Sequence, residues 1–329
     1  MTQQEFTAEW NNDSDFIVCH TSGSTGEPKE IHLSKDFMRQ SARRTNTFFG
    51  IDASSRLHTC LDFRYIASKM MVVRSEEAGC ELTSELPSNR PLQEIADDER
   101  ITLLSVVPSQ MQWILDNGCR WRGVENFLIG GAPIPSLLRR RIALSGMKAW
   151  ESYGMTETAS HIALRRVEED DTVPFRPLDG VEVSVDEQGC LVIDMPGLGK
   201  VTTTDLAEIT PDAGFRILGR ADNCVISGGV KIIPEKLEAV LGPFIAFDYC
   251  ISSVPDPKWG ERLVLVVRKG DAGVSDDLLR NAVAVRLAQF KKSLDLGVKA
   301  PKEIIVVGEF PLTSSGKLDR KSLKQLIDR

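Results

Sequence analysis

The sequence predicts an α/β protein built from three parts. Strand-like and helix-like runs alternate between residues 101 and 151, which indicates βαβ units around a mainly parallel sheet flanked by helices. From Val181, short β-rich runs separated by turn residues predict a small antiparallel β module. A mixed pattern restarts after Asp222 and predicts a small α+β C-terminal domain. We therefore expect a large domain over residues 1–221 and a small domain over residues 222–329.

The first part of the large domain shows two helical patterns around one strand. Residues 36–49 place their apolar side chains near one face, and Ser34 or Asp36 is a suitable N-cap. Residues 66–78 form a second helical pattern that carries two cations, Lys69 and Arg74. The remaining elements expected here are strands at residues 57–61, 101–107, 124–129 and 147–151 and helices at residues 109–116 and 136–144.

The later elements alternate less regularly. Residues 181–185 and 191–193 flank a turn and predict a β-hairpin. The C-terminal domain is expected to contain strands at residues 224–227, 247–253, 262–268 and 303–307 and helices at residues 234–241, 276–290 and 319–327.

Composition excludes several classes of function. A formal net charge of −7 without a basic block argues against nucleic acid as the main partner. The seven cysteines have neither an even count nor Cys-x-x-Cys spacing, so they indicate neither a disulfide framework nor a zinc site. The N-terminal region contains no apolar signal segment, and no apolar run approaches the length of a bilayer span. We expect a cytoplasmic protein with no membrane span, and homo-oligomerisation stays open.

One short stretch combines hydroxyls, glycines and a lysine between two apolar runs. Small residues let backbone N–H groups approach a ligand, and hydroxyls with a lysine suit a polyphosphate. A polar hairpin turn is the alternative, because the same residue types are common in turns. The pattern differs from the Walker A loop, since Pro28 stands where that motif has glycine. The stretch reads Thr21-Ser22-Gly23-Ser24-Thr25-Gly26-Glu27-Pro28-Lys29.

Two further stretches follow strand candidates directly. In open parallel sheets, ligands bind beyond the carboxyl ends of the strands, so both stretches lie where a ligand is expected. A plain βα turn is the alternative for each of them. The stretches are Gly130-Gly131-Ala132-Pro133 and Tyr153-Gly154-Met155-Thr156-Glu157.

Four motifs in one order resemble the acyl-adenylate-forming family, which includes acyl-CoA synthetases, peptide-synthetase adenylation domains and luciferases. The resemblance covers the chain from about Phe16 to its end. The motifs are the stretch at residues 21–29, Ser152-Tyr153-Gly154-Met155-Thr156-Glu157-Thr158, Gly219-Arg220-Ala221-Asp222 and Ser314-Ser315-Gly316-Lys317-Leu318-Asp319-Arg320.

The resemblance implies an enzyme that activates a carboxylic acid with ATP and Mg²⁺ and passes the acyl group to coenzyme A. By this resemblance Thr156 contacts the α-phosphate, Glu157 binds Mg²⁺, and Lys317 bridges the carboxylate and the α-phosphate. Asp205 resembles the acid that holds the ribose hydroxyls, and Arg220 lies beside it; a surface ion pair is the alternative for these two residues. The other ATP-binding residues that the resemblance implies are Thr21, Ser22, Gly23, Ser24, Thr25, Gly26, Lys29, Gly131, Ala132, Pro133, Tyr153 and Gly154.

The resemblance also implies a mobile C-terminal domain. That domain turns about Asp222, after which Gly228 and Gly229 line a tunnel for the thiol. The chain departs from the family in three respects. The usual Thr-Gly-Asp is replaced by Thr203-Thr204-Asp205. The loop at residue 21 comes early, so the large domain is expected to be N-terminally shortened, and the usual aromatic-His pair of the acyl pocket is replaced at residues 61–65.

The stretch from Met155 to Arg165 resembles the o-succinylbenzoate–CoA ligases of menaquinone biosynthesis most closely. That substrate has two carboxylates, and one of them stays ionised in the pocket and needs a cation. Arg74 is the candidate, with Lys69 as a second; surface positions on the helix are the alternative. Ser160 and His161 are candidates for hydrogen bonds to the acid. Other readings remain: another aryl- or fatty-acyl-CoA ligase, an adenylation domain that loads a carrier protein, and a catalytically impaired nucleotide-binding protein.

Overall fold

The computed structural model describes residues 1–21, 29–96, 99–118, 120–169, 171–242, 244–245, 247–270, 275–293, 300–313 and 318–328. The chain divides into two compact units. Unit 1 comprises residues 1–184, 192–201 and 209–216, and unit 2 comprises residues 185–191, 202–208 and 217–329. The domain boundary at residues 221–222 stays a prediction.

Unit 1 is built on a seven-stranded sheet whose order is β4-β3-β5-β6-β7-β8-β9. The first five strands in this order pair in parallel, as the alternating sequence pattern predicts, and β8 and β9 join antiparallel. The strands are β3 (Arg56–Thr59), β4 (Glu81–Ser84), β5 (Leu103–Val106), β6 (Phe127–Ile129), β7 (Ala149–Met155), β8 (Ser160–Arg166) and β9 (Arg176–Pro177).

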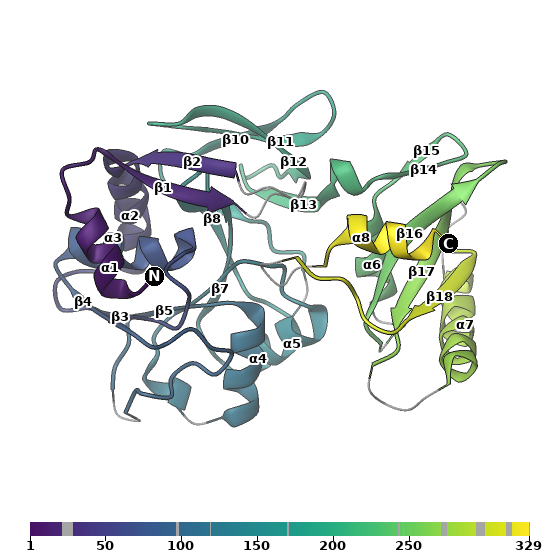
Figure 1. The fold of residues 1–329 in the computed structure, drawn as a ribbon, viewed down its shortest axis with the longest axis horizontal. Helices are drawn as coiled ribbons and strands as arrows, with labels where there is room; N and C mark the ends of the chain where they lie inside the picture. Colours follow the sequence, from purple (N-terminus) through teal and green to yellow (C-terminus); the bar gives the residue numbers. More distant parts are fainter. Residues whose placement is uncertain are drawn as a thin grey trace. The chain divides into compact units, whose positions relative to one another are not determined.

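Helices cover this sheet (Figure 1). The side chains of Leu104 and Phe127, from neighbouring strands, are buried in one core cluster with Met111 of α4 and Ile142 of α5. Helix α3 contacts β3, β4 and β5, and it packs along α2. The helices are α2 (Lys35–Phe49), α3 (Ile66–Ala78), α4 (Pro108–Asn117) and α5 (Ser136–Leu144). The predicted bounds of α3 and α5 are confirmed.

Helix α2 begins and ends at residues with the chemistry that helix termini require. The hydroxyl of Ser34 accepts a hydrogen bond from the backbone N–H of Phe37, at 3.2 Å. Gly50 follows the last turn with φ 65°, the left-handed conformation that glycine adopts without steric cost. Of the two predicted caps, Ser34 is therefore the one that acts.

The N-terminal residues form a helix that the sequence prediction missed. Helix α1 (Gln3–Trp10) begins with a reciprocal capping box between Thr2 and Glu5, and it buries Phe6 and Trp10. It precedes an antiparallel hairpin of β1 (Phe16–Thr21) and β2 (Lys29–Ser34). Eight residues with only two large apolar side chains give a weak periodic signal in the sequence. The helix is stabilised by the tertiary contacts of Phe6 and Trp10.

The predicted antiparallel module is a four-stranded sheet of order β10-β11-β12-β13. Its residues are divided between the two units. The strands are β10 (Glu182–Val185), β11 (Cys190–Met195), β12 (Gly199–Ile209) and β13 (Phe215–Arg220).

The rest of unit 2 contains a five-stranded sheet and, among its described residues, three α-helices. Strand β17 has a core cluster on each face: Leu265 packs in one with α6 and α7, and Val264 packs in the other with Leu323 of α8. The elements are β14 (Val225–Ser227), β15 (Val230–Ile232), α6 (Pro234–Leu241), β16 (Tyr249–Asp256), β17 (Gly260–Arg268), α7 (Asp276–Ser293), β18 (Glu303–Val307) and α8 (Arg320–Ile327). This arrangement confirms the predicted α+β character.

One local expectation was wrong. The sequence suggested that a strand ends at Glu151 and that Tyr153-Gly154-Met155-Thr156-Glu157 follows it. The strand instead continues to Met155, and the next element is β8, which pairs antiparallel with it. Tyr153 and Gly154 therefore lie within a strand. Among the described helices, none is both long and apolar enough to span a bilayer.

Candidate functional site

The candidate phosphate loop lies between the two strands of the β1–β2 hairpin, in which Thr21 pairs with Lys29. The apolar runs on the two sides of the loop thus form paired strands. The loop itself lies outside the described residues, as do the side chain of Thr21 and the whole of Lys317. The predictions that fall on this loop concern Ser22, Gly23, Ser24, Thr25 and Gly26, and they stay predictions.

The stretch that follows β6 is held by a buried carboxylate. Glu151 on β7 accepts a hydrogen bond from the backbone N–H of Ile134, at 3.3 Å, directly after Gly131-Ala132-Pro133. The same carboxylate forms ion pairs with Arg139 and with Arg165, the latter at 2.7 Å. Glu151 therefore fixes the end of this candidate ATP-binding stretch, a role that the sequence did not predict.

The turn between β7 and β8 carries two of the predicted residues, and a third, Gly154, lies at the end of β7. A Cβ atom on Gly154 would lie 2.2 Å from the carbonyl oxygen of Ser160, so only glycine allows this close approach of the two strands. The strand register shifts between Tyr153 and Gly154, and Ala159 and Ser160 adopt positive φ angles of 50° and 83°. Such strained backbone at non-glycine residues clusters at functional sites. This turn carries Thr156 and Glu157.

Glu157 suits a role as a magnesium ligand. Its carboxylate is half-buried, and no ion pair joins it to another described residue. Mg²⁺ is usually held by one or two carboxylates, with substrate phosphates and water completing the coordination. A single free carboxylate beside the hydroxyl-bearing Thr156 fits that pattern, with Glu157 as the residue that would hold the ion.

Arg74 is the most deeply buried cation of the described chain. Its side chain on α3 has 0% exposure, and no described carboxylate pairs with it. Its Nη2 atom lies 3.4 Å from the hydroxyl of Ser160 and 3.4 Å from Nδ1 of His161. Three of the four residues predicted to meet the acyl substrate are thus brought together from α3 and β8.

Burial governs the charge of this cluster. It lowers the pKa of Arg74 to about 9, so the guanidinium stays protonated at neutral pH. Burial, and secondarily the charge of Arg74, holds the pKa of His161 well below its usual value. The cluster therefore carries one positive charge, on Arg74, beside a neutral imidazole. An anion is the natural partner for such a charge.

Lys69 lies in other surroundings, although it shares α3 with Arg74. Its ammonium group donates to the backbone carbonyl of Val18 on β1, at 3.2 Å, and stands 5.2 Å from the ring centroid of Phe6. These contacts link α3 to β1 and α1. The prediction that Lys69 meets the acyl substrate stays a prediction, and its described contacts favour a structural role.

In unit 2, Arg220 joins two predicted site residues. It donates to both carboxylate oxygens of Asp222, at 3.0 and 2.8 Å, and approaches Asp205 at 3.4 Å. The hydrogen bond from Arg220 lowers the pKa of Asp222. The ion pair between Asp205 and Arg220, which the sequence offered as an alternative, is present in the structure, and it does not exclude a second role in binding ribose.

Gly228 and Gly229 form the two-residue turn of the β14–β15 hairpin. Both have positive φ angles, 56° and 76°, as tight hairpin turns of this kind require. The N–H of Gly228 donates to the carbonyl of Trp259, at 2.8 Å. The structure thus explains why glycine stands at both positions, and their place in a thiol tunnel stays a prediction.

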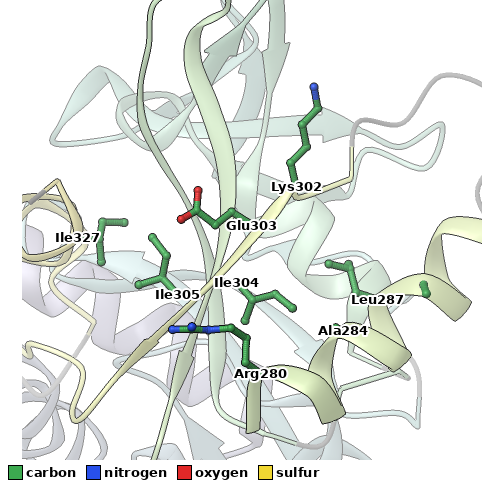
Figure 2. Close-up of a pocket in the computed structure, with 9 residues that line it drawn as sticks. Arg280, Ala284, Leu287, Lys302, Glu303, Ile304, Ile305 and Ile327 are labelled. Atoms are coloured by element: carbon green, nitrogen blue, oxygen red, sulfur yellow. The ribbon is translucent and has the colours of Figure 1, made fainter. Parts of the chain in front are cut away.

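Unit 2 also contains a hollow of about 570 Å³ between α7 and β18. Figure 2 shows Arg280, Ala284 and Leu287 on the helix, facing Ile304 on the strand. None of the predicted site residues lines this hollow, so it is separate from the candidate site.

Sequence reasoning missed two hydroxyls beside the Arg74 cluster. Thr45 and Ser41 on α2 are fully enclosed, and each bonds to the β8 side of the cluster: Thr45 to His161, and Ser41 to the carbonyl of Ala159. A signal was available. The two hydroxyls lie four residues apart on the predicted apolar face of that helix, where a polar side chain needs a partner.

The fold and this set of residues define an adenylate-forming enzyme. The family described as AMP-binding enzyme matches residues 2–201. This chain belongs to that family.

The relatives narrow the class further. The 2-succinylbenzoate–CoA ligase of Geobacillus sp. (strain WCH70) is 27% identical over 358 residues, which cover 98% of this chain and 71% of that protein. The crystal structure of an acyl-CoA synthetase (AMP-forming)/AMP-acid ligase II-like protein from Dyadobacter fermentans is 32% identical, with a TM-score of 0.62, over 98% of this chain and 92% of that one.

A third similarity concerns the fold alone. The o-succinylbenzoate–CoA synthetase of Bacillus subtilis, solved with its acyl-adenylate intermediate, has a TM-score of 0.77 at 23% identity and covers 93% of this chain and 68% of that one. Together these findings confirm the family resemblance, the α/β fold class and the assignment to the AMP-forming acid–thiol ligases. Enzymes of this class use ATP and coenzyme A.

Proposed function

We propose that this protein converts o-succinylbenzoate to its coenzyme A thioester in menaquinone biosynthesis. One carboxylate oxygen of the acid attacks the α-phosphorus of ATP, and pyrophosphate leaves, which gives the acyl-adenylate. The thiol of coenzyme A then attacks the acyl carbon, AMP leaves, and the thiol proton passes to solvent. Mg²⁺ neutralises phosphate charge in the first step.

The residues of the chain divide this work. Thr156 holds the α-phosphate and Glu157 the metal ion. Lys317 supplies the charge that bridges the two reacting groups. The loop between β1 and β2 holds the β- and γ-phosphates, while the stretch after β6, fixed by Glu151, positions the base.

The observation that carries the choice of acid is the burial of Arg74 without a described carboxylate partner. A buried unpaired charge is costly, and an ionised group of the substrate offsets that cost. An acid with a second carboxylate provides such a group after the first has reacted. A fatty or simple aromatic acid does not.

The guanidinium is fully enclosed in the structure, so contact with a carboxylate requires the neighbouring side chain of Ser160 to turn aside. Ser160 is half-buried and begins β8, directly after the strained turn. Ser160 therefore joins Arg74, which it contacts at 3.4 Å, to the turn that carries Thr156 and Glu157. We propose that Ser160 and His161 complete the carboxylate pocket.

Pyrophosphate exchange with a panel of acids tests this proposal. We expect o-succinylbenzoate to support exchange, and coenzyme A then to yield its thioester, with benzoate and fatty acids far weaker. Strong exchange with a monocarboxylic acid alone would identify another acyl-CoA ligase. Acyl transfer only to a carrier protein would identify a loading domain, and binding of ATP without exchange would identify an impaired enzyme.

We also propose the cytoplasm as the compartment of this protein. The six described cysteines are all free thiols, as a reducing environment favours.

A further inference from the structure

A chain of hydrogen bonds runs from Arg74 to the backbone of α2. Nη2 of Arg74 lies 3.4 Å from Nδ1 of His161, and Nε2 of the same ring lies 3.1 Å from the hydroxyl of Thr45. That hydroxyl is 3.2 Å from the carbonyl oxygen of Ser41, one turn earlier on the helix. All four residues are buried, so water offers no easy substitute for a missing partner.

The guanidinium of Arg74 determines which group donates and which accepts in each of these hydrogen bonds. A guanidinium has donors only, so the ring atom that faces Arg74 must accept, and Nδ1 of His161 carries no proton. The imidazole is neutral, as its burial beside a cation requires, so its single proton is on Nε2. Nε2 therefore donates to Thr45, whose own proton goes to the carbonyl of Ser41.

We infer that Thr45 is a positioning residue for substrate selection: it fixes the tautomer and orientation of His161, which in turn holds Arg74 towards the substrate carboxylate. This inference rests on the proposed function. In the opposite tautomer, Nδ1–H would face the donors of Arg74, and the ring would no longer hold the guanidinium. Because Thr45 accepts from Nε2–H, it selects the tautomer that Arg74 needs.

The same helix also holds the turn that precedes His161. The hydroxyl of Ser41 donates to the carbonyl of Ala159, at 2.8 Å, within the turn of positive φ angles. Two hydroxyls of α2, one turn apart, thus fix both the backbone before His161 and the ring itself. Removal of the Thr45 hydroxyl leaves the Ser41 anchor intact, so a change at Thr45 isolates the effect on the ring.

The test compares Thr45→Val and Thr45→Ser with Thr47→Val. Valine keeps the branched shape but cannot accept a hydrogen bond, serine keeps the hydroxyl, and Thr47 is an exposed threonine of the same helix that serves as the matched control. We expect Thr45→Val to raise KM for o-succinylbenzoate and to lower kcat/KM about tenfold, the effect of one lost buried hydrogen bond. The value for benzoate should change less than about twofold, and Thr45→Ser and Thr47→Val should resemble the parent.

A second readout does not depend on activity. The ¹⁵N shifts of the His161 ring in the ligand-free protein report its tautomer, and the signal is assigned by its absence in His161→Gln, since the chain has four histidines. We expect the Nε2–H form in the parent and in Thr45→Ser, and its loss in Thr45→Val.

Several results would overturn the inference. They are an Nδ1–H tautomer in the parent protein, an unchanged tautomer in Thr45→Val, and equal losses for both acids, which would make Thr45 a general structural residue. Failure of the parent to use o-succinylbenzoate at all would instead refute the proposed function. The NMR result would still decide whether Thr45 determines the tautomer of His161.

Discussion

At the scale of single residues, Arg74 owes its chemistry to its surroundings. An arginine in a helical pattern is most often a solvated surface residue, and this one has 0% exposure. Its described neighbours are a hydroxyl, a neutral imidazole and the sulfur atom of Met71, at 3.4 Å, none of which carries a negative charge. The position therefore selects for a ligand that brings the missing charge.

Replacement of Arg74 should change selectivity more than activity in general. We expect Arg74→Ala to lower kcat/KM for o-succinylbenzoate by a factor that corresponds to about 2–5 kcal/mol, because the substrate carboxylate is left without its cation. Benzoate has no second carboxylate, so kcat/KM for benzoate should fall little in Arg74→Ala. Arg74→Lys should recover only part of the loss, since a lysine does not meet a carboxylate with two parallel bonds.

Steady-state kinetics with both acids and all three proteins provide the measurement. A parallel fall for the two acids would mean that Arg74 supports the fold, and the choice of substrate would then rest on sequence similarity alone.

Lys317 should act in the first half-reaction rather than in the binding of ATP. Its charge is needed mainly when negative charge builds on the α-phosphate, and loss of one such donor lowers rates on the order of a hundredfold to a thousandfold. We expect Lys317→Ala to reduce pyrophosphate exchange by about that factor with little change in the Kd for ATP. Lys321→Ala, an exposed lysine on α8, is the control. Normal exchange in Lys317→Ala would show that another group bridges the reactants.

At the scale of elements, the β7–β8 pair depends on one glycine. A Cβ at position 154 would meet the carbonyl oxygen of Ser160 at 2.2 Å and the Cα of His161 at 2.5 Å, both of them backbone atoms that cannot move alone. We expect Gly154→Ala to destabilise unit 1 by about 2–4 kcal/mol, as backbone strain at such positions does. It should also impair the use of every acid, since the turn carries Thr156 and Glu157.

Thermal unfolding and pyrophosphate exchange measure the two effects of Gly154→Ala. Gly308→Ala is a suitable control, because a Cβ at that position meets no atom within 4 Å. Equal melting temperatures for the two variants would show that the strands separate at little cost.

The elements that the sequence predicted well are those with strong local signals. Residues 66–78 and 136–144 have helical bounds identical to those of α3 and α5. The missed elements lack such signals. Helix α1 has two buried side chains, and the end of β7 contains glycine and turn-forming residues that favour a loop until β8 pairs with them. Pairing between strands is a tertiary effect that local propensity does not report.

The same limit applies to the candidate site. The motifs identified Arg74, Ser160 and His161, and the fold brings them together. Lys69, chosen for its place on the same helix, points to β1 instead. Which face of α3 meets β8 is decided by packing between α2, α3 and the sheet, so sequence spacing alone could not separate the two cations.

At the scale of the whole molecule, each unit has its own hydrophobic core. Unit 1 buries the cluster around Phe127, and unit 2 buries clusters on both faces of β17. The restart of the sequence pattern after Asp222 corresponds to this second core. Buried polar groups such as His161 belong to the core of unit 1, so they link its stability to pH.

The sign of that link follows from the shifted pKa of His161. Burial beside Arg74 holds this pKa well below the value of the unfolded chain, about 6.5, so the unfolded state binds more protons as the pH falls below that value. Above about pH 6.5 the protonation of His161 therefore does not affect the stability of unit 1. Below that pH it lowers the free energy of unfolding of unit 1 by about 1.4 kcal/mol for each unit by which the pH falls.

We expect the free energy of unfolding of unit 1 to fall less steeply between pH 6.5 and 5.5 in His161→Gln than in the parent. This difference in slope is expected even if the two proteins differ in their free energy of unfolding at pH 7.5. His20→Gln is the control substitution, because the side chain of His20 is 58% exposed. Urea unfolding followed at several pH values measures the slope, with tryptophan fluorescence as the probe, since four of the five tryptophans belong to unit 1. An unchanged slope in His161→Gln would show that the pKa of His161 is the same in the folded and unfolded chains, which would contradict the effect assigned to its burial beside Arg74.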